Sequence, residues 1–282
     1  MTIKEALASG NKNNKHENMW LLEKVTGLTS TQLRLKGECL HLGNAFKLNQ
    51  EETLQYLDML EKRHNHVPLQ YVLEDWTFMG RPIKCRPGVL IPRSDTEILA
   101  SEAINFLNRF TNKESPPCAL DLCTGSGCVG IVLAYYCPSA YITATDISPI
   151  ALELAQENAV LNGVHNRLTF AQTNLFEGLK GSFCCITANP PYIPTAETAN
   201  LQEEVKQEPI LALDGGLDGL DFYRRIIPES IKYLEPGGGI FLEIGNTQRE
   251  AVSNILLSHG FENVRTIKDI ENRDRVVCAF IN

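Results

Sequence analysis

The run Asn189-Pro190-Pro191-Tyr192 has the most restricted chemistry in the chain, and it directly follows the apolar stretch 183–188. The side-chain oxygen of Asn189 and the carbonyl of Pro190 can each accept one N–H of a planar –NH₂ group, which biases the delocalised lone pair toward tetrahedral geometry. The two prolines stiffen this arrangement. Tyr192 can lie against the flat group and favour developing positive charge. The run therefore predicts a site that activates an amide or amino nitrogen.

A second candidate site is the turn 121–127, which follows another apolar run. Its glycines let the backbone approach a ligand closely and leave the first amides of the following helix free. Gly125, Gly127 and Gly130 also match G-x-G-x-x-G, which is a weak signal by itself. The turn residues that we expect to contact a cofactor are Asp121, Cys123, Thr124, Gly125, Ser126 and Gly127.

An acidic residue, Asp146, ends the next strand-like run, 19 residues after Gly127. A carboxylate there can accept both hydroxyls of a ribose, so the turn and Asp146 together predict an adenosine-containing cofactor. An alternative role for Asp146 is to cap the helix that begins at Ser148 and Pro149. These features do not separate NAD(H) from S-adenosylmethionine. The run 189–192 separates the two cofactors and favours S-adenosylmethionine, because this run has no role in hydride transfer.

From residue 118 onward, apolar strand-like runs alternate with helical stretches. This alternation predicts an α/β fold with a mostly parallel sheet covered by helices on both faces. Ligands bind beyond the carboxyl ends of such strands, where the winding order switches, and the candidate residues lie at such ends. The expected strands are 119–122, 141–144, 168–171, 183–188, 239–244, 264–267 and 276–281.

The length of the chain favours two domains joined by a short linker. Residues 1–66 have apolar positions spaced by three and four, which predicts a small helical domain that either docks a partner or is a solvated bundle. Proline and glycine punctuate residues 67–93, as in a β-hairpin linker. The catalytic domain is expected to span 94–282. It would open with a capping box, in which Ser94 accepts from the amide of Glu97 and the Glu97 side chain reaches back.

Composition narrows the class of partner. The 26 basic and 34 acidic side chains give a net charge of −8, which disfavours a nucleic acid substrate. The nine cysteines contain no C-x-x-C pair, and they fit reduced, buried thiols of a cytoplasmic protein better than disulfides or a metal site. The sequence has neither a secretory signal nor an apolar stretch long enough for a membrane span, so we expect no membrane partner.

N-P-P-Y after the fourth expected strand, with D-x-x-T-G-S-G after the first, resembles methyltransferases that modify planar amide or amino nitrogens. Further motifs extend the resemblance over most of residues 66–282, and they are similar to those of the HemK/PrmC-type protein-(glutamine-N5) methyltransferases. These motifs are Pro68-Leu69-Gln70-Tyr71, Leu90-Ile91-Pro92-Arg93-Ser94-Asp95-Thr96-Glu97, Gln207-Glu208-Pro209, Asp214-Gly215-Gly216-Leu217-Asp218-Gly219-Leu220 and Asn272-Arg273-Asp274-Arg275-Val276-Val277.

The resemblance implies a class I S-adenosylmethionine-dependent methyltransferase, Rossmann-like, with a seven-stranded sheet and a small N-terminal helical domain for substrate docking. It also implies the reaction. A methyl group would pass from S-adenosylmethionine to the side-chain amide nitrogen, N5, of the glutamine in the Gly-Gly-Gln loop of class I peptide chain release factors. The implied partner is thus a protein, with no direct role for nucleic acid.

Site residues carry over by position. By resemblance, residues 123–127 face the methionine and ribose parts of the cofactor, Asp146 faces the ribose hydroxyls, and Asn174 and Leu175 face the adenine. Residues 189–192 hold the substrate amide, with Asn189 also next to the cofactor.

Two positions depart from the family pattern, which usually has glycine at 123 and aspartate at 174. Cys123 needs a backbone conformation that a side chain tolerates, and Asn174 can still accept through its oxygen while losing the charge. We expect weaker cofactor binding with activity retained.

Two other functions stay open at this point. N-P-P-Y suits the exocyclic N6 amino group of adenine in DNA or RNA equally well, although the net charge and the lack of an added target-recognition domain count against it. A non-catalytic scaffold that binds the cofactor would account for the departures at Cys123 and Asn174. The destination of a labelled methyl group separates the three functions: release factor, nucleic acid or neither.

Overall fold

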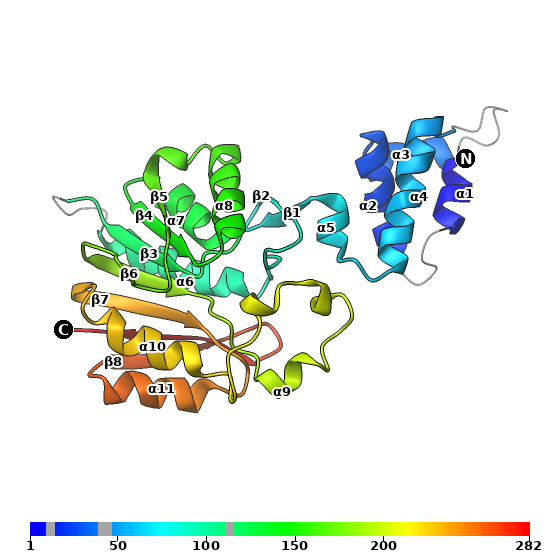
Figure 1. Ribbon diagram of the computed structural model, residues 1–282. Helices are drawn as coiled ribbons and strands as arrows, with labels where there is room; N and C mark the ends of the chain where they lie inside the picture. Colours follow the sequence, from blue (N-terminus) through cyan, green and yellow to red (C-terminus); the bar gives the residue numbers. More distant parts are fainter. Residues whose placement is uncertain (10–14, 39–46, 111–114) are drawn as a thin grey trace. The chain divides into compact units, whose positions relative to one another are not determined.

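The computed structural model describes residues 1–9, 15–38, 47–110 and 115–282. These described residues separate into two compact units, Met1–Glu74 and Asp75–Asn282, which Figure 1 colours from blue to red along the chain. Residues 67–74, expected in the linker, belong to the first unit. Of the positions singled out in the sequence, Cys39 lies outside the described residues. The other cysteines are free thiols, and most of them are buried.

The first unit consists of short helices around an apolar core. Helix α4 begins with a capping box that the sequence analysis missed: Asn49 Oδ1 accepts from the Glu52 amide at 2.8 Å, and Glu52 Oε2 accepts from the Asn49 amide at 2.7 Å. Buried Tyr56 fixes α4 against the first helix by donating to the Ala6 carbonyl at 2.8 Å. The helices are α1 (Ile3–Ser9), α2 (Lys15–Thr26), α3 (Ser30–Glu38), α4 (Gln50–His64) and α5 (Leu69–Leu73).

The second unit opens with the antiparallel hairpin of β1 (Asp75–Phe78) and β2 (Arg81–Lys84). Met79 and Gly80 both have positive φ, as a tight two-residue hairpin turn requires. The predicted capping box at Ser94 is wrong. Helix α6 (Thr96–Leu107) has no side-chain cap, and Glu97 Oε1 instead accepts from the Met79 amide at 2.8 Å. The tertiary contact with the hairpin replaces the local one.

The remaining described strands form the predicted mostly parallel sheet, in the order β5-β4-β3-β6-β7-β9-β8. Of these strands, only β9 runs in the direction opposite to the others. The winding direction reverses between β3 and β6, which places their carboxyl ends at the switch point. The strands are β3 (Cys118–Leu122), β4 (Tyr141–Asp146), β5 (Leu168–Gln172), β6 (Phe183–Ala188), β7 (Leu234–Glu243), β8 (Glu262–Lys268) and β9 (Asp274–Phe280). Strand β7 is longer than expected, since it begins at Leu234.

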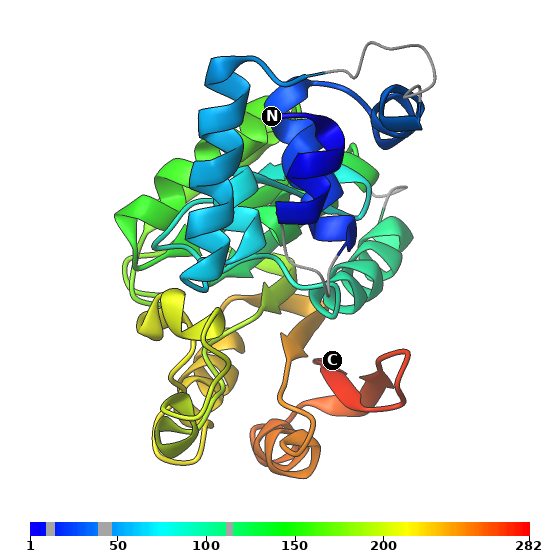
Figure 2. The same cartoon turned by 90° about the vertical axis from the view of Figure 1, so that its right-hand side faces the viewer.

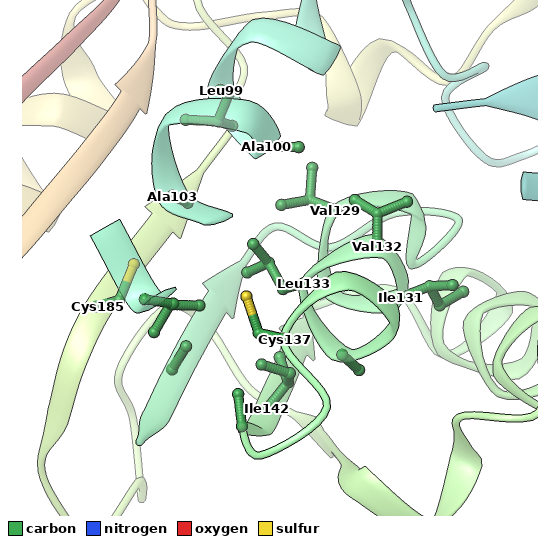
Figure 3. Close-up of a cluster of buried hydrophobic side chains, with 14 of the residues drawn as sticks. Leu99, Ala100, Ala103, Val129, Ile131, Val132, Leu133, Cys137, Ile142 and Cys185 are labelled. Atoms are coloured by element: carbon green, nitrogen blue, oxygen red, sulfur yellow. The ribbon is translucent and has the colours of Figure 1, made fainter. Parts of the chain in front are cut away.

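Helices cover both faces of the sheet, because neighbouring residues of each strand point to opposite faces. On one face, α6 and α7 (Cys128–Tyr136) pack over Ala119, Cys185 and Phe241, and Figure 3 shows the side chains of these two helices meeting. On the other face, α10 (Asp221–Ser230) and α11 (Arg249–Ser258), drawn yellow and orange in Figures 1 and 2, pack over Leu120, Ile186 and Leu242.

Helix α8 (Pro149–Leu161) begins as predicted, with Ser148 Oγ accepting from the Ala151 amide at 3.3 Å and Pro149 in the first turn. A short helix, α9 (Thr195–Thr198), follows β6, and 3-10 turns lie at 108–110, 165–167, 205–207 and 210–212. In the described ranges, no helix combines the length and the apolar character needed to cross a bilayer.

Candidate active site

A cavity of about 310 Å³ lies beyond the carboxyl ends of β3, β4 and β6, a size in the usual range for small-molecule sites. It brings together most of the site residues predicted from sequence. Gly127, Pro190 and Tyr192 are described but are not among its lining residues. The predicted residues that line the cavity are Asp121, Cys123, Thr124, Gly125, Ser126, Asp146, Asn174, Leu175, Asn189 and Pro191.

Asp121 holds the 121–127 turn in place through hydrogen bonds to its buried carboxylate. Its carboxylate is buried and accepts from the Thr124 hydroxyl at 2.6 Å, the Gly130 amide at 3.1 Å and the Thr187 hydroxyl at 2.8 Å. Burial raises the pKa of Asp121 to about 6, although these hydrogen bonds act in the opposite direction. Through these hydrogen bonds Asp121 shapes the turn and the start of α7.

Gly127, at the end of the turn, and Gly130, in α7, are each required for a different steric reason. Gly127 has φ +81, and a Cβ there would lie 2.9 Å from the Ala155 Cβ, so only glycine lets α7 begin this close to α8. Gly130 has ordinary φ, but a Cβ would lie 3.3 Å from Asp121 Oδ2. The third glycine of the fingerprint therefore lets α7 approach the buried carboxylate.

Cys123 takes the left-handed conformation, with φ +55, and Leu175, which also lines the cavity, does the same at φ +58. This conformation is costly for a residue with a Cβ, and it occurs mostly where function requires the backbone to be held. Cys123 therefore carries backbone strain that a glycine at this position would not have. Burial, followed by the nearby Asp146 and Asp121 carboxylates, raises the pKa of the Cys123 thiol, so it stays protonated.

The strain at Cys123 can be measured. We expect the Cys123→Gly variant to be more stable than Cys123→Ala by about 1 kcal/mol, because both remove the thiol and only alanine keeps the Cβ. Urea unfolding of the two variants gives the difference. At Glu153, an exposed position inside α8, the matched pair should show the reverse order by about 1 kcal/mol. Equal stability of the two variants at 123 would contradict the assigned strain.

Asp146 lies at the end of β4 and is hydrogen-bonded both to the 121–127 turn and to the start of α8. Its Oδ2 accepts from the Gly125 amide at 2.9 Å and its Oδ1 from the Ser148 amide at 2.9 Å. Burial raises the pKa of Asp146, opposed by these backbone hydrogen bonds. Each carboxylate oxygen can accept a second hydrogen bond, so Asp146 can brace the turn and still receive hydroxyl donors from the cavity.

Arg225 and Phe222 are cavity residues that the sequence analysis missed. Arg225 of α10 donates to Asn174 Oδ1 at 2.7 Å, while Asn174 Nδ2 donates to Glu177 Oε1 at 3.0 Å. The oxygen expected to accept from a ligand thus accepts from Arg225. No pattern in the sequence linked these two positions, which are 51 residues apart.

Asn189 and Tyr192 both follow β6, but their side chains lie in different surroundings. Asn189 lines the cavity, and its Nδ2 donates to the Thr96 hydroxyl oxygen at 3.2 Å. Tyr192 packs against the core on the α10 and α11 face, and its hydroxyl donates to Glu243 Oε1 at 3.4 Å. Burial, with the neighbouring Glu243 carboxyl, raises the pKa of Tyr192.

The backbone of the 189–192 loop is braced from behind by the glycine-rich motif at 214–220. A Cβ on Gly215 would lie 2.7 Å from the Tyr192 Cα, and one on Gly219 would lie 2.3 Å from the Tyr192 carbonyl oxygen. The side-chain Nε2 of Gln248 donates to that same carbonyl at 2.9 Å. The glycines of this motif therefore permit two chain segments to pack backbone to backbone.

Two more motifs contact the segment 90–97, part of which lines the cavity. Buried Glu208 accepts from the Ile91 amide at 2.9 Å and pairs with Arg93, so the Gln207-Glu208-Pro209 motif clamps the wall segment 90–93. Arg275, from the motif at 272–277, pairs with Asp95 at 3.1 Å. The sequence contained these motifs, but nothing local indicated that they contact one another.

Glu243 lies fully buried at the end of β7, where Tyr192, Thr96, Arg275 and Asp95 face its carboxyl. Burial raises its pKa to about 7, opposed by hydrogen bonds and by Arg275. Its Oε2 has no hydrogen-bond partner among the described residues.

This raised pKa predicts a pH-dependent stability. Between the ordinary value of 4.5 and about 7, the folded chain holds a proton that the unfolded chain has lost, so the contribution of Glu243 to stability falls as pH rises. Glu243→Gln removes this dependence. We expect the unfolding free energy of the variant relative to the parent chain to rise by up to about 3 kcal/mol across that window. Chemical denaturation at a series of pH values measures it, and a constant difference would contradict the raised pKa.

Comparison with known proteins finds two family models and several curated relatives. The family model described as "PrmC N-terminal domain" matches residues 3–73, and the "Methyltransferase small domain" model matches residues 101–211. A release factor glutamine methyltransferase of Thermodesulfovibrio yellowstonii is 42% identical over 82% of this chain and 82% of the relative. That of Geobacter sulfurreducens is 39% identical over 95% and 90%, and that of Clostridium acetobutylicum is 37% identical over 99% and 98%.

Solved structures share the fold at low sequence identity. A methyltransferase from Pyrococcus furiosus superposes with a TM-score of 0.52 and 18% identity over 82% of this chain and 98% of that one. The 16S rRNA N2 G1207 methyltransferase of T. thermophilus, in complex with AdoMet and guanosine, has a TM-score of 0.52 and 18% identity over 74% and 50%. These likenesses show the methyltransferase fold alone.

Proposed function

The chain belongs to the release factor glutamine methyltransferase family, and from this premise we propose its full reaction. It is an S-adenosylmethionine-dependent methyltransferase that methylates N5 of the glutamine in the Gly-Gly-Gln loop of class I peptide chain release factors. One observation carries the proposal: Asn189, held by Thr96, and Asp146 line the same cavity. An acceptor for an amide thus stands beside an acceptor for a ribose.

The residues present fit S-adenosylmethionine, which supplies an electrophilic methyl group when it is bound. The Asp146 carboxylate has acceptor capacity left for ribose hydroxyls. Leu175, Val129 and Phe222 give the cavity apolar walls for the adenine and the methionine chain. The Gly125 turn leads into the N-terminus of α7, which has no side-chain cap and so leaves backbone amides to bind polar groups.

The protein contributes orientation more than acid–base chemistry. Asn189 Oδ1, from a residue that lines the cavity, and the carbonyl of Pro190, which is buried next to it outside the lining, are proposed to accept the two N–H groups of the substrate carboxamide, which turns the nitrogen lone pair toward the methyl group. The prolines and the glycine brace behind them hold these acceptors in place. A strong general base is not required, because the methylated amide nitrogen is acidic enough to lose its proton afterwards.

The role that we propose for Tyr192 differs from the one expected from sequence, in which its ring lies against the substrate amide. Its hydroxyl is bound to Glu243 and its ring packs into the core, so we propose that it anchors the loop. Stacking on the substrate amide is then left to other cavity residues.

We further propose that class I release factors are the substrate class, that no nucleic acid or membrane takes part directly, and that the reaction occurs in the cytoplasm. The curated relatives favour this over methylation of adenine N6, for which they give no support. The helical unit Met1–Glu74 is proposed to dock the release factor.

Mass spectrometry tests the proposal directly. A class I release factor is incubated with the enzyme and S-adenosylmethionine, digested, and compared with a sample that lacks enzyme. We expect a gain of one methyl group on the glutamine of the Gly-Gly-Gln loop. Labelling of nucleic acid in its place would favour the adenine-N6 function, and cofactor binding without transfer to either would favour the scaffold.

A further inference from the structure

Asn174, on the cavity wall, has both polar atoms of its side-chain amide hydrogen-bonded to other side chains. Its Oδ1 accepts from Arg225 of α10 at 2.7 Å, and its Nδ2 donates to Glu177 Oε1 at 3.0 Å. A guanidinium can only donate, and a carboxylate can only accept. The orientation of this amide therefore follows from the chemistry of its two partners, because turning it over would break both hydrogen bonds.

The same two partners indicate which atom of the amide faces the cavity. Arg225, which is bound to Oδ1, lines the cavity, whereas Glu177, which is bound to Nδ2, is described but is not among the lining residues. Oδ1 has two lone pairs, and Arg225 uses one of them. Asn174 thus presents to the cavity an oxygen that can accept one more hydrogen bond.

The backbone on either side of Asn174 is fixed beside Asp146. The Thr173 amide donates to the Asp146 carbonyl at 3.0 Å, and the Glu177 amide donates to the Asn174 carbonyl at 3.3 Å. Asp146 and Asn174 line the same cavity. A nucleoside with its ribose at Asp146 would therefore bring its base toward Asn174 and Leu175, where the resemblance places the adenine.

Arg225 differs in its surroundings from the arginine that precedes it. Arg224 pairs with Asp218 at 2.5 Å and is not among the residues that line this cavity. Arg225 donates to a neutral side chain, and its guanidinium carbon lies 5.8 Å from the centre of the Phe222 ring, which also lines the cavity. The guanidinium of Arg225 is thus held at the cavity wall, where it acts on the Asn174 amide.

We propose that Arg225 is a positioning residue that makes the cofactor site selective for a 6-amino purine. By holding Asn174 Oδ1 toward the cavity, it offers an acceptor to the N6 amino group of adenine. A 6-oxo purine such as hypoxanthine brings the lone pairs of its O6 against that oxygen, and the held amide cannot turn over to offer Nδ2. The inference rests on the S-adenosylmethionine cofactor of the proposed function and not on its protein substrate.

The test compares binding of S-adenosylhomocysteine with binding of S-inosylhomocysteine, which carries hypoxanthine in place of adenine, by calorimetric titration. The parent chain should prefer the adenosyl compound by at least about fivefold. Arg225→Met changes an exposed position, removes the donor and keeps a long side chain. We expect the Kd for S-adenosylhomocysteine to rise about fivefold, the equivalent of one lost hydrogen bond, and the Kd for S-inosylhomocysteine to stay within about twofold. Loss of packing alone would weaken both compounds equally, and an unchanged ratio of the two Kd values would overturn the inference.

Two further variants make the test specific. Arg224→Met, at the next position of the same helix, is the matched control and should leave both Kd values within about twofold of the parent chain. Arg225→Met is also added to an Asn174→Ala background. If Arg225 acts through Asn174, it should change the ratio there by less than about twofold, because the group that it positions is gone. An equal fivefold fall in both backgrounds would mean that Arg225 contacts the base itself, and it would overturn the positioning role.

These outcomes are distinct from failure of the proposed function. A chain that shows the expected selectivity but transfers no methyl group to release factor would support the inference and contradict the proposed substrate. A chain that methylates release factor but binds the adenosyl and inosyl compounds equally well would support the proposed function and overturn the inference.

Discussion

Replacing Asn189 by alanine is expected to lower kcat for release factor methylation by about 10²–10³-fold, the usual cost of removing one preorganised group that acts on the reacting atoms. Asn189 lines the cavity and is held by Thr96, so its side chain is oriented before the substrate arrives. The Kd for S-adenosylhomocysteine should change by less than about threefold, because Asp146 and the 121–127 turn remain.

The measurement is transfer of labelled methyl to release factor under single-turnover conditions, with calorimetric titration of the cofactor product in parallel. Asn200→Ala is a matched control, because Asn200 is exposed in the same loop region and should leave both quantities unchanged. Near-normal turnover of the Asn189 variant would refute the role of this amide as acceptor.

The second large effect concerns the cofactor. Asp146→Ala is expected to weaken binding of S-adenosylmethionine by about 1–3 kcal/mol, or roughly 5- to 150-fold in Kd, because charge-assisted hydrogen bonds to a ligand are lost. Part of the loss is indirect, since Asp146 also accepts from the Gly125 and Ser148 amides at 2.9 Å. With saturating cofactor, kcat should fall much less than in the Asn189 variant.

Asp146→Asn separates the two contributions. It keeps one oxygen acceptor and removes the charge, so we expect a Kd between those of the parent chain and the alanine variant. Equilibrium titration of all three proteins checks the order. An unchanged Kd for Asp146→Ala would exclude Asp146 from the cofactor site.

Comparing the starts of α6 and α8 shows when a local sequence pattern is enough to predict a helix cap. Ser148 and Pro149 start α8 as predicted, because the cap needs only residues within one turn of the chain. Ser94 and Glu97 have the same local signature, but Glu97 bonds the hairpin amide of Met79, 18 residues away. A capping box stabilises by about 1 kcal/mol, so a tertiary hydrogen bond of similar strength can replace it.

The residues of the N-P-P-Y run show the same division at the candidate site. Their place at the carboxyl end of β6 follows from the apolar run 183–188, which is buried throughout. Whether each side chain faces the cavity or the core depends on what lies behind the loop. Glu243 attracts the Tyr192 hydroxyl from the neighbouring strand, while Thr96 holds Asn189 at the cavity.

The sequence by itself determined the α/β class, most of the strand positions and the kinship of the chain, and it predicted a nucleotide turn and an amide-binding loop. These depend on the periodicity of apolar residues and on short motifs, which the chain encodes locally. Only the tertiary structure decided which polar groups meet: Glu208 with Ile91, 117 residues apart, Arg225 with Asn174, and Thr96 with Asn189. The physical reason is that such pairs depend on the order in which strands lie side by side, and a hydrogen bond forms only when that order brings donor and acceptor within about 3 Å.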